Sequence, residues 1–303
     1  MTGRPRPGIL NIDKPHGMTS MEVVRRIKRA CGMKKGVGHG GTLDPIATGV
    51  IPVCVGQATR VMEYLLNGSK EYTCRIQMGV STDTYDAMGE IVAERDPSFV
   101  SLQLVESALR KFRGEIAQVP PMYSALKRQG RRLYELAREG VEIELDPRPV
   151  VVHEINLTGW EPPVATVNVV CGKGFYMRSL AHDLGESLGC GGHLKALVRR
   201  RTGPFHLDDA VLLEDALSRI ESGHADDLLH NPDSVLASMP AMIVGKRHLK
   251  MIRSGRPLPP GVGLEIDSPD ERARAYGTDG AFVAIMRFDG KLRQWRPNKV
   301  FNT

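Results

Sequence analysis

The sequence predicts an α+β protein with a mixed, mainly antiparallel central sheet flanked by helices and a small C-terminal β domain. Three observations support this fold class. Apolar and polar residues alternate from Tyr72 to Val80, which indicates a half-buried strand. Apolar residues recur with helical spacing in several other segments. Strands and helices do not alternate strictly, which disfavours a parallel α/β sheet.

The first 70 residues contain two predicted strands and two predicted helices. Residues 9–12 form a short apolar strand. Thr19 and Glu22 have the spacing of a capping box, and the helix that follows carries an apolar face formed by Val23, Val24, Ile27 and Cys31. Residues 32–49 are rich in glycine and are expected to be a loop. A second strand over residues 51–55 and a short helix ending near Leu66 follow.

The remaining elements complete a larger domain of residues 1–240 and a smaller one of residues 241–303. We expect helices over residues 102–113 and 176–188, the second ended by Gly189, and strands over residues 150–155 and 165–171. The acidic stretch 208–236 is helix-like. Beyond Pro240, short apolar runs at 263–266, 281–286 and 292–295 alternate with Gly, Pro and Asp, which predicts the small β domain.

Composition narrows the class of protein. A charge of +6 and a pI of about 9.1 favour a polyanionic partner. The five cysteines are scattered and lack the close spacing of a zinc site, so they indicate buried thiols in a reducing compartment. The N-terminal apolar run is too short for a signal peptide, and no other run has membrane-spanning length. We therefore expect a cytoplasmic protein.

The segment Gly36-Val37-Gly38-His39-Gly40-Gly41 matches the G-x-G-x-x-G pattern of dinucleotide-binding proteins. That pattern binds pyrophosphate only between a strand and a helix N-terminus. Here a helix precedes it, and Asp44-Pro45 follows, where proline disfavours a helical Asp44. Nucleotide-cofactor binding is therefore rejected, and the glycines instead allow close approach of a ligand to the backbone.

Four motifs in order resemble those of the TruB-type tRNA pseudouridine-55 synthases, a pseudouridine synthase family. They are Asp13-Lys14-Pro15-His16-Gly17-Met18-Thr19-Ser20, the segment from Gly38 to Gly49, Lys70-Glu71-Tyr72, and Gly172-Lys173-Gly174-Phe175-Tyr176-Met177-Arg178-Ser179. The segment from Pro121 to Lys127 matches as well. The tail is similar to the PUA-type RNA-binding domain that ends many members. Gly40 departs from the pattern, because the family usually has Thr or Ser there.

The resemblance implies an isomerase that converts uridine 55 in the T arm of tRNA to pseudouridine, without metal or organic cofactor. It assigns the essential carboxylate to Asp44, with Arg178 as its partner and Tyr72 beside the reactive base. It also assigns substrate contacts to further residues: Tyr176 stacks on the flipped uracil, His39 fills the vacated space, and Leu197 and Lys14 contact the substrate.

Basic clusters supply the predicted contacts to the RNA backbone. They are Lys34 and Lys35, Lys127 and Arg128, Arg131 and Arg132, and Arg199, Arg200 and Arg201. Lys246, Arg247, Lys250, Arg253 and Arg256 could extend this surface onto the C-terminal domain. RNA affinity should then fall steeply with salt. We expect no obligate protein partner, no membrane association, and a monomer.

Two alternatives remain at this point. The chain could be a non-catalytic tRNA-binding or RNA-folding protein on the same scaffold, which only a turnover assay would distinguish. It could also be a pseudouridine synthase that acts on another RNA, within a ribonucleoprotein. The joint presence of Asp44, Arg178 and both tyrosines favours an active enzyme, and the lack of a long basic tail favours one that works alone.

Overall fold

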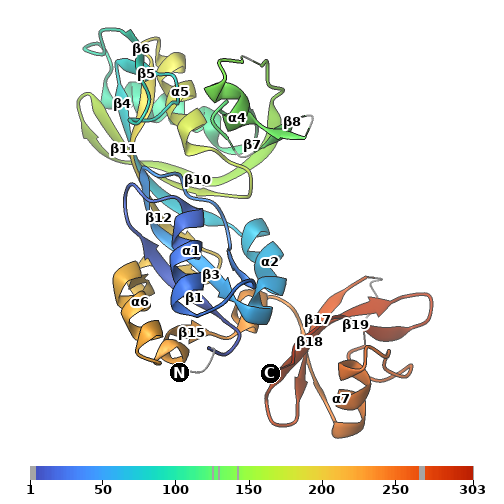
Figure 1. Cartoon of the computed structure of the whole chain (residues 1–303). Coiled ribbons are helices and arrows are strands. Elements are labelled where there is room, and N and C mark those ends of the chain that lie inside the picture. The colour runs from blue at the N-terminus through green and yellow to red at the C-terminus, as the bar shows by residue number, and fades with distance from the viewer. Residues whose placement is uncertain (1–4, 125, 129, 142, 266–269, 303) are drawn as a thin grey trace.

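The fold is described from a computed structural model, which covers residues 5–124, 126–128, 130–141, 143–265 and 270–302. One large mixed sheet organises the chain up to residue 230 (Figure 1). Its main path runs, in spatial order, through β14 (Val211–Leu212), β1 (Gly8–Lys14), β3 (Ala47–Val55), β12 (Gly192–Thr202), β4 (Lys70–Met78), β11 (Val164–Cys171), β10 (Arg148–Glu161) and β7 (Gly114–Gln118).

Shorter strands extend this sheet or form separate hairpins. Three pair with its members: β2 (Val37–His39) with β3, β13 (Phe205–His206) with β12, and β15 (Leu229–His230) with β1. Two hairpins stand outside it: β5 (Val80–Thr82) with β6 (Ile91–Glu94), and β8 (Lys127–Arg128) with β9 (Arg131–Arg132). Among the described strands of the large sheet, the parallel pairings are β1 with β14 and β3 with β12, so the predicted mixed, mainly antiparallel sheet is confirmed.

Strand β12 lies at the centre of the sheet, although it comes late in the chain. It inserts between β3 and β4, which are neighbours in sequence. Its register places Leu197 opposite Ala47 of β3 and Cys74 of β4, and Arg199 opposite Tyr72. The N-terminal half of the sheet and the half containing β4, β11 and β10 are therefore joined through one strand.

Among the described residues, six α-helices accompany the sheet: α1 (Ser20–Ala30), α2 (Met62–Asn67), α3 (Leu102–Leu109), α4 (Leu133–Arg138), α5 (Met177–Leu188) and α6 (Leu213–Glu221). The Thr19 side chain accepts a hydrogen bond from the Glu22 N–H at 3.1 Å, as the capping pattern predicts. Gly189 ends α5 with a left-handed φ of 81°, also as predicted. The main core packs Val23 and Ile27 of α1 together with residues of the sheet and of α5.

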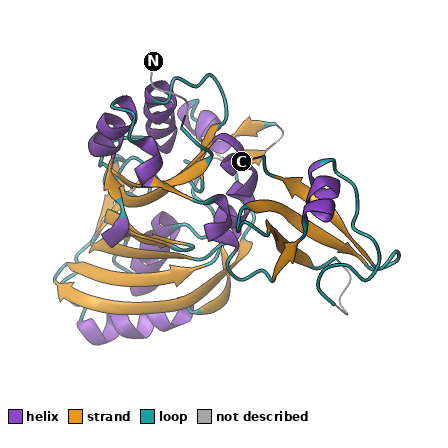
Figure 2. Cartoon of the chain, turned by 90° about the horizontal axis from the view of Figure 1, so that it is seen from below, coloured by secondary structure: helices purple, strands orange, loops and turns teal. Residues whose placement is uncertain are grey.

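A second, four-stranded sheet follows, in the order β16 (Ala241–Val244), β17 (Arg272–Gly277), β18 (Phe282–Asp289) and β19 (Gln294–Val300). Figure 2 shows this sheet projecting to one side of the larger body. It has a core of its own around Trp295 and Ile252. The division of the chain into domains at residue 240 stays a prediction, and the second sheet begins at Ala241.

Helix α2 contacts a different part of the protein on each of its sides. Toward the loop 38–49, Met62 and Leu65 pack against Gly38 and Gly40. Toward the second sheet, the Tyr64 hydroxyl accepts a hydrogen bond from Arg272 Nη1 at 2.8 Å. Glu63 in turn accepts one from Lys299 Nζ at 2.8 Å. This short helix therefore connects the glycine-rich loop to the C-terminal sheet.

The structure corrects several element predictions. The stretch 32–49 contains the short strand β2 and the start of β3, because Gly38 pairs with Cys54 and Gly49 pairs with both Lys14 and Arg199. The stretch 208–236 contains only the nine-residue helix α6, together with short strands and 3-10 turns. The second sheet carries a helix, α7 (Lys246–Arg253), that the sequence analysis did not predict. Ile266, in one of the predicted apolar runs, lies outside the described residues.

Candidate active site

Asp44 lies between β2 and β3, and contacts on both of its sides hold it in place. On the N-terminal side, the Ser20 hydroxyl donates to the Leu43 carbonyl at 2.9 Å and accepts from the Leu43 N–H at 2.7 Å. On the C-terminal side, the Pro45 carbonyl accepts from the Gly17 N–H at 2.8 Å. The Asp44 side chain itself is 32% exposed. The backbone is thus fixed on both sides of a carboxylate that solvent and a ligand can reach.

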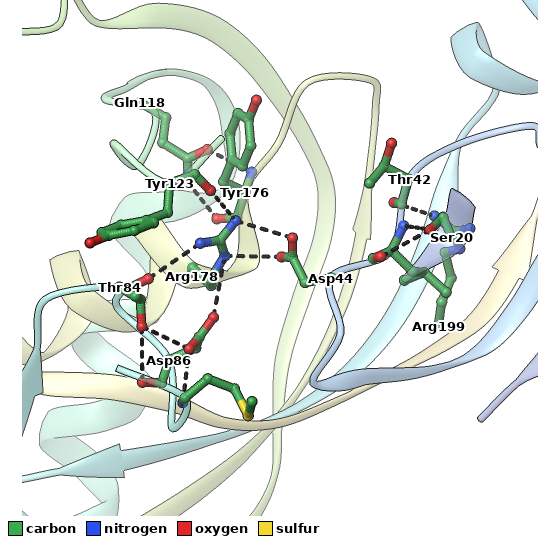
Figure 3. A network of polar contacts seen from close by, with 12 residues as sticks. Ser20, Thr42, Asp44, Thr84, Asp86, Gln118, Tyr123, Tyr176, Arg178 and Arg199 are labelled. Carbon is green, nitrogen blue, oxygen red and sulfur yellow. Dashed lines mark hydrogen bonds and ion pairs between the residues drawn. The ribbon is translucent and has the colours of Figure 1, made fainter. Parts of the chain in front are cut away.

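Arg178 binds the Asp44 carboxylate with two parallel hydrogen bonds. Its Nε donates to Oδ2 at 2.9 Å and its Nη2 donates to Oδ1 at 3.1 Å (Figure 3). The two residues are 134 positions apart, one on the loop before β3 and the other in the first turn of α5. Arg178 is only 6% exposed, and its Nη2 also donates to the Tyr123 carbonyl at 2.8 Å. The predicted pairing of Asp44 with Arg178 is therefore present.

A second carboxylate, Asp86, lies on the other side of Arg178, and the sequence analysis missed it. Asp86 Oδ2 is 3.7 Å from Arg178 Nε, and the residue is buried. Its Oδ1 accepts hydrogen bonds from the Thr84 hydroxyl at 2.8 Å and from the Met88 N–H at 2.9 Å. Figure 3 shows Arg178 between the two carboxylates. A buried arginine in this position is held from both sides.

Three further predicted site residues, Tyr72, Tyr176 and Leu197, come from β4, the start of α5 and β12. Tyr72 is buried at 9% exposure, and burial raises the pKa of its hydroxyl, with Arg199 opposing that shift. Tyr176 is half-buried, and burial raises its pKa as well, with Arg178 acting in the opposite direction. Asp44 adds to the shift of both tyrosines, so both lie within its electrostatic reach. Leu197 is buried on β12, on the strand that also bears Arg199.

The prediction that Arg199 contacts an RNA phosphate is wrong. Arg199 is 1% exposed, and its guanidinium donates to main-chain carbonyls of the loop and of β3. The acceptors are Val50 at 2.7 Å, Thr42 at 3.1 Å and Gly41 at 3.0 Å. A guanidinium with its donors committed in this way is inaccessible to a phosphate. Arg199 instead fixes the backbone that leads to Asp44.

Lys14 is also buried, which contradicts its prediction as a direct substrate contact. Its Nζ donates to the carbonyls of Pro15 at 2.9 Å, Met18 at 2.6 Å and Pro45 at 3.4 Å, and it has no solvent exposure. Burial lowers the pKa of the Lys14 ammonium to about 8, and Asp44 opposes that shift. Lys14 therefore joins three turns of backbone around Asp44 instead of reaching outward.

Arg200 and Arg201 differ from Arg199 because a β-bulge lies between Arg199 and Arg201, so that Arg201 pairs in register with Glu71 instead of Lys70. Arg199 pairs in register with Tyr72, whereas the Arg200 Nε donates to the Thr73 hydroxyl at 3.3 Å. Arg200 is exposed on the face opposite Tyr72, and its contact to the RNA backbone stays a prediction. Arg201 is half-buried and pairs with Glu71 at 3.3 Å.

The other predicted phosphate contacts lie on loops and on the β8–β9 hairpin. Lys34 and Lys35 are exposed between α1 and β2. Arg131 is exposed and pairs with Glu139. Three of the predicted side chains lie outside the part that the structure describes: Lys127, Arg128 and Arg132.

Comparisons with known proteins agree on the family. A model described as TruB family pseudouridylate synthase (N terminal domain) matches residues 28–177, and one described as tRNA pseudouridylate synthase B C-terminal domain matches residues 178–239. A tRNA pseudouridine synthase B of Dehalococcoides mccartyi is 42% identical over 97% of this chain and 96% of its own length. Another, from Syntrophotalea carbinolica, is 44% identical over 97% of this chain and 98% of its own length. The chain belongs to the TruB family of pseudouridylate synthases.

Solved structures are similar over almost the whole TruB-family chain. A crystal structure of a Cbf5–Nop10–Gar1 complex superposes with a TM-score of 0.72 at 26% identity, covering 97% of this chain and 84% of that one. A structure of an H/ACA RNP bound to a substrate RNA containing 2′-deoxyuridine gives a TM-score of 0.72 at 25% identity, covering 98% of this chain and 85% of that one. The predicted family, the predicted fold and the predicted class of isomerase are therefore confirmed.

The departure from the TruB pattern at Gly40 has a local explanation. A Cβ atom at this position would lie 2.6 Å from Leu65 Cδ1 and 2.8 Å from Leu65 Cβ. The second contact is with the root of the side chain, so a rotamer change of Leu65 does not relieve it. Glycine here therefore lets α2 pack closely against the loop.

His39, next to Gly40, is half-buried on β2, and its Nδ1 is buried with no hydrogen-bond partner among the described residues. Burial lowers the pKa of His39, and the nearby positive charge of Arg199 lowers it further, so the ring is neutral at neutral pH. Within the described part of the chain, no group of three or more His, Cys, Asp or Glu side chains could hold a metal ion. No described helix is long and apolar enough to cross a membrane.

Proposed function

We propose that this TruB-family protein converts uridine 55 in the T arm of tRNA to pseudouridine, with Asp44 as the essential carboxylate. The names of the curated relatives support tRNA as the substrate, because they are tRNA pseudouridine synthases over nearly the full length of the chain. The motif around Asp44 supports position 55, because it resembles that of the pseudouridine-55 synthases.

The observation that carries the proposal is the geometry of Asp44. Its carboxylate is accessible, while its partner Arg178 is almost completely buried and binds both carboxylate oxygens. A surface ion pair would leave both side chains exposed and would contribute little to stability. A buried cation that orients an open carboxylate instead suits a group that must meet a reacting atom in one orientation.

The reaction rearranges bonds within one nucleotide. The N1–C1′ bond breaks, the uracil turns without leaving, C5 bonds to C1′, and the C5 proton moves to N1, so the atoms balance without an external group. Asp44 acts at the sugar or the base while C1′ is electron-deficient, and Arg178 keeps it in place. No redox step is involved, so the chemistry itself needs no metal or organic cofactor.

The surrounding side chains receive roles that follow from their positions. Flipping the uridine out of the arm costs a few kcal/mol, which contacts in the pocket must offset. Tyr176 stacks on the uracil, Leu197 forms an apolar wall, and neutral His39 enters the vacated space in the arm. Burial raises the pKa of Tyr72, so its hydroxyl stays protonated and assists proton transfer from C5 by hydrogen bonding, not as the base that takes the proton.

RNA binding beyond the pocket depends on exposed cations. Lys34 and Lys35 are exposed between α1 and β2, and the β8–β9 hairpin brings further basic residues. The second sheet, with five basic residues in and after α7, extends the surface as a small RNA-binding domain: Lys246, Arg247, Lys250, Arg253 and Arg256. We propose that the protein works as a monomer on tRNA.

The test is tritium release from an unmodified tRNA transcript labelled at uridine C5. Wild-type protein and Asp83→Asn, which alters an exposed carboxylate that Arg178 does not contact, should both release tritium from one site in the T loop. Asp44→Asn should bind the transcript and release none. Binding by all three proteins without release would favour a non-catalytic RNA-binding protein.

Mapping the product decides between the two catalytic alternatives. Pseudouridine at position 55 alone would support the proposed substrate. Turnover only on another RNA, or only with added protein partners, would favour a ribonucleoprotein role like that of the Cbf5 complexes, whose fold this chain shares.

A further inference from the structure

Helix α5 begins without a capping side chain of its own. Its N-cap residue is Tyr176, which has extended backbone angles and whose side chain makes no cap hydrogen bond. Helix N-termini leave several N–H groups without an intrahelical partner, and Ser, Thr, Asp or Asn normally satisfies one of them. Tyrosine cannot do this, although the helix must place Arg178 accurately two residues later.

Gln118, on strand β7, binds the main chain of this N-cap residue. Its Oε1 accepts from the Tyr176 N–H at 2.8 Å, and its Nε2 donates to the Tyr176 carbonyl at 3.0 Å. Gln118 is the last residue of β7 and is 3% exposed. The amide therefore binds the Tyr176 main chain with a donor and an acceptor at once, as a neighbouring strand would do.

Two more hydrogen bonds join the same pair of segments. The Ser179 hydroxyl donates to the Val119 carbonyl at 2.7 Å, and Arg178 Nη2 donates to the Tyr123 carbonyl at 2.8 Å. Figure 3 shows Gln118 and Tyr123 beside the first turn of α5, with Asp44 on the far side of Arg178. Of these bonds, those of Gln118 alone act on the Tyr176 backbone.

The position of the Tyr176 ring depends on this backbone. The side chain is half-buried and starts from backbone that lies beside Arg178 in Figure 3, and both Arg178 and Asp44 influence the pKa of its hydroxyl. A tyrosine with only two side-chain torsions follows its Cα closely. Loss of the Gln118 amide would leave the Tyr176 N–H and carbonyl without these partners and let the ring shift.

We propose that Gln118 is a positioning residue that fixes Tyr176 against the flipped uracil, an inference that rests on the proposed function. The amide does not touch the substrate. It acts through the Tyr176 main chain, and so its removal should affect the chemical step rather than RNA binding.

The first test is Gln118→Met, which keeps the length and loses both hydrogen bonds. The matched control is Gln77→Met, since Gln77 is half-buried on β4 and also uses both ends of its amide, with Met78 and Lys195. We expect kcat for pseudouridine formation to fall roughly 10- to 100-fold in Gln118→Met, with KM changed less than about threefold. A rise in KM with normal kcat would overturn the proposal.

A double-mutant cycle with Tyr176→Ala separates positioning from general destabilisation. If Gln118 acts through the ring of Tyr176, Gln118→Met should lower kcat by less than about threefold in the Tyr176→Ala background. Equal losses in both backgrounds would mean that Gln118 does not act through that ring.

Gln118→Glu adds a pH readout. A neutral carboxyl group can accept from the Tyr176 N–H and donate to its carbonyl, whereas a carboxylate can only accept. The activity of this variant relative to wild type should therefore fall as pH rises from about 5 to 8, since burial raises the pKa of a carboxyl group above its usual 4.3 or so. The relative activity of Gln118→Met should stay flat. A flat profile for both variants would contradict the proposal.

Amide hydrogen exchange distinguishes a failure of this proposal from a failure of the proposed function. Exchange in a peptide covering residues 174–180 should accelerate in Gln118→Met and not in Gln77→Met. If the wild type forms no pseudouridine and exchange still accelerates, the proposed function is wrong and the contact to Tyr176 stands. If exchange is unchanged, Gln118 does not fix Tyr176, whatever the activity.

Discussion

Replacing Asp86 by asparagine removes one charge from the active site and little else. The Asp86 Oδ1 atom accepts from the Thr84 hydroxyl and the Met88 N–H, and the amide oxygen of asparagine can take over both bonds. What is lost is the attraction between Asp86 Oδ2 and Arg178 Nε, which are 3.7 Å apart. The variant therefore tests whether Arg178 needs a carboxylate on both sides.

The separation sets the size of the effect. Two opposite charges about 4 Å apart attract each other by about 4 kcal/mol at an effective dielectric constant of about 20. Much of this attraction offsets the cost of burying the two charges, so the net interaction energy lost in Asp86→Asn should be smaller, about 1–3 kcal/mol. Without Asp86, the guanidinium is drawn toward Asp44 alone and neutralises it more fully. A carboxylate neutralised in this way is a weaker nucleophile.

We expect Asp86→Asn to lower the single-turnover rate of pseudouridine formation by about 10- to 100-fold, since each tenfold corresponds to about 1.4 kcal/mol. The dissociation constant for tRNA should stay unchanged, because Asp86 is buried. Asp83→Asn, in the same loop but exposed, is the control and should keep the wild-type rate. An Asp86→Asn rate equal to that of the control would refute the idea that Asp86 orients Arg178.

Three further predictions follow from the contacts around the loop. Gly40→Thr should destabilise the protein by about 1–3 kcal/mol in thermal or urea unfolding, because the new Cβ would overlap Leu65. The loss of stability should be smaller in a Leu65→Ala background, and an equal loss there would exclude the clash with Leu65 as its cause. Burial lowers the pKa of Lys14 to about 8, so between pH 8 and about 10.5 the unfolded chain holds a proton that the folded chain has lost. The free energy of unfolding of wild type relative to Lys14→Met should therefore rise with pH over that window, and a fall would mean that the pKa of Lys14 is not lowered by folding. Arg200→Gln should leave the salt dependence of tRNA binding unchanged, because Arg200 lies on the face opposite Tyr72. A plot of log binding constant against log salt concentration whose slope is reduced in magnitude by about one would show that Arg200 contacts a phosphate.

The sequence predicted the strongest periodic elements well. The alternation that begins at Tyr72 became β4, and the helix ended by Gly189 became α5. Helix α7 was missed because Lys246–Arg253 is short, half of its residues are Lys or Arg, and only Ile252 is buried in it. Such a helix is formed by packing on the second sheet, which a local pattern does not reveal.

The site was predictable only in part. Asp44 and Arg178 were paired through their motifs, since nothing local joins residues so far apart in the chain. Asp86 was missed because it lies in a loop without periodicity, and only the folded structure brings that loop to Arg178. The alternation rule could have separated Arg199 from Arg200, but the run of three arginines was interpreted by its charge alone.

The central position of β12 has a consequence for synthesis on the ribosome. β1 and β3 emerge early from the ribosome, but β12, which joins them to β4, ends only at Thr202. β14 and β15, which pair with the other edge of β1, emerge later still. At about 5–20 residues per second, β12 appears roughly 10–40 s after β1. Until then Arg199 cannot fix the loop that carries Asp44, and Arg178 has only just left the exit tunnel. The nascent chain therefore has no assembled site around Asp44 until at least two thirds of it has been translated.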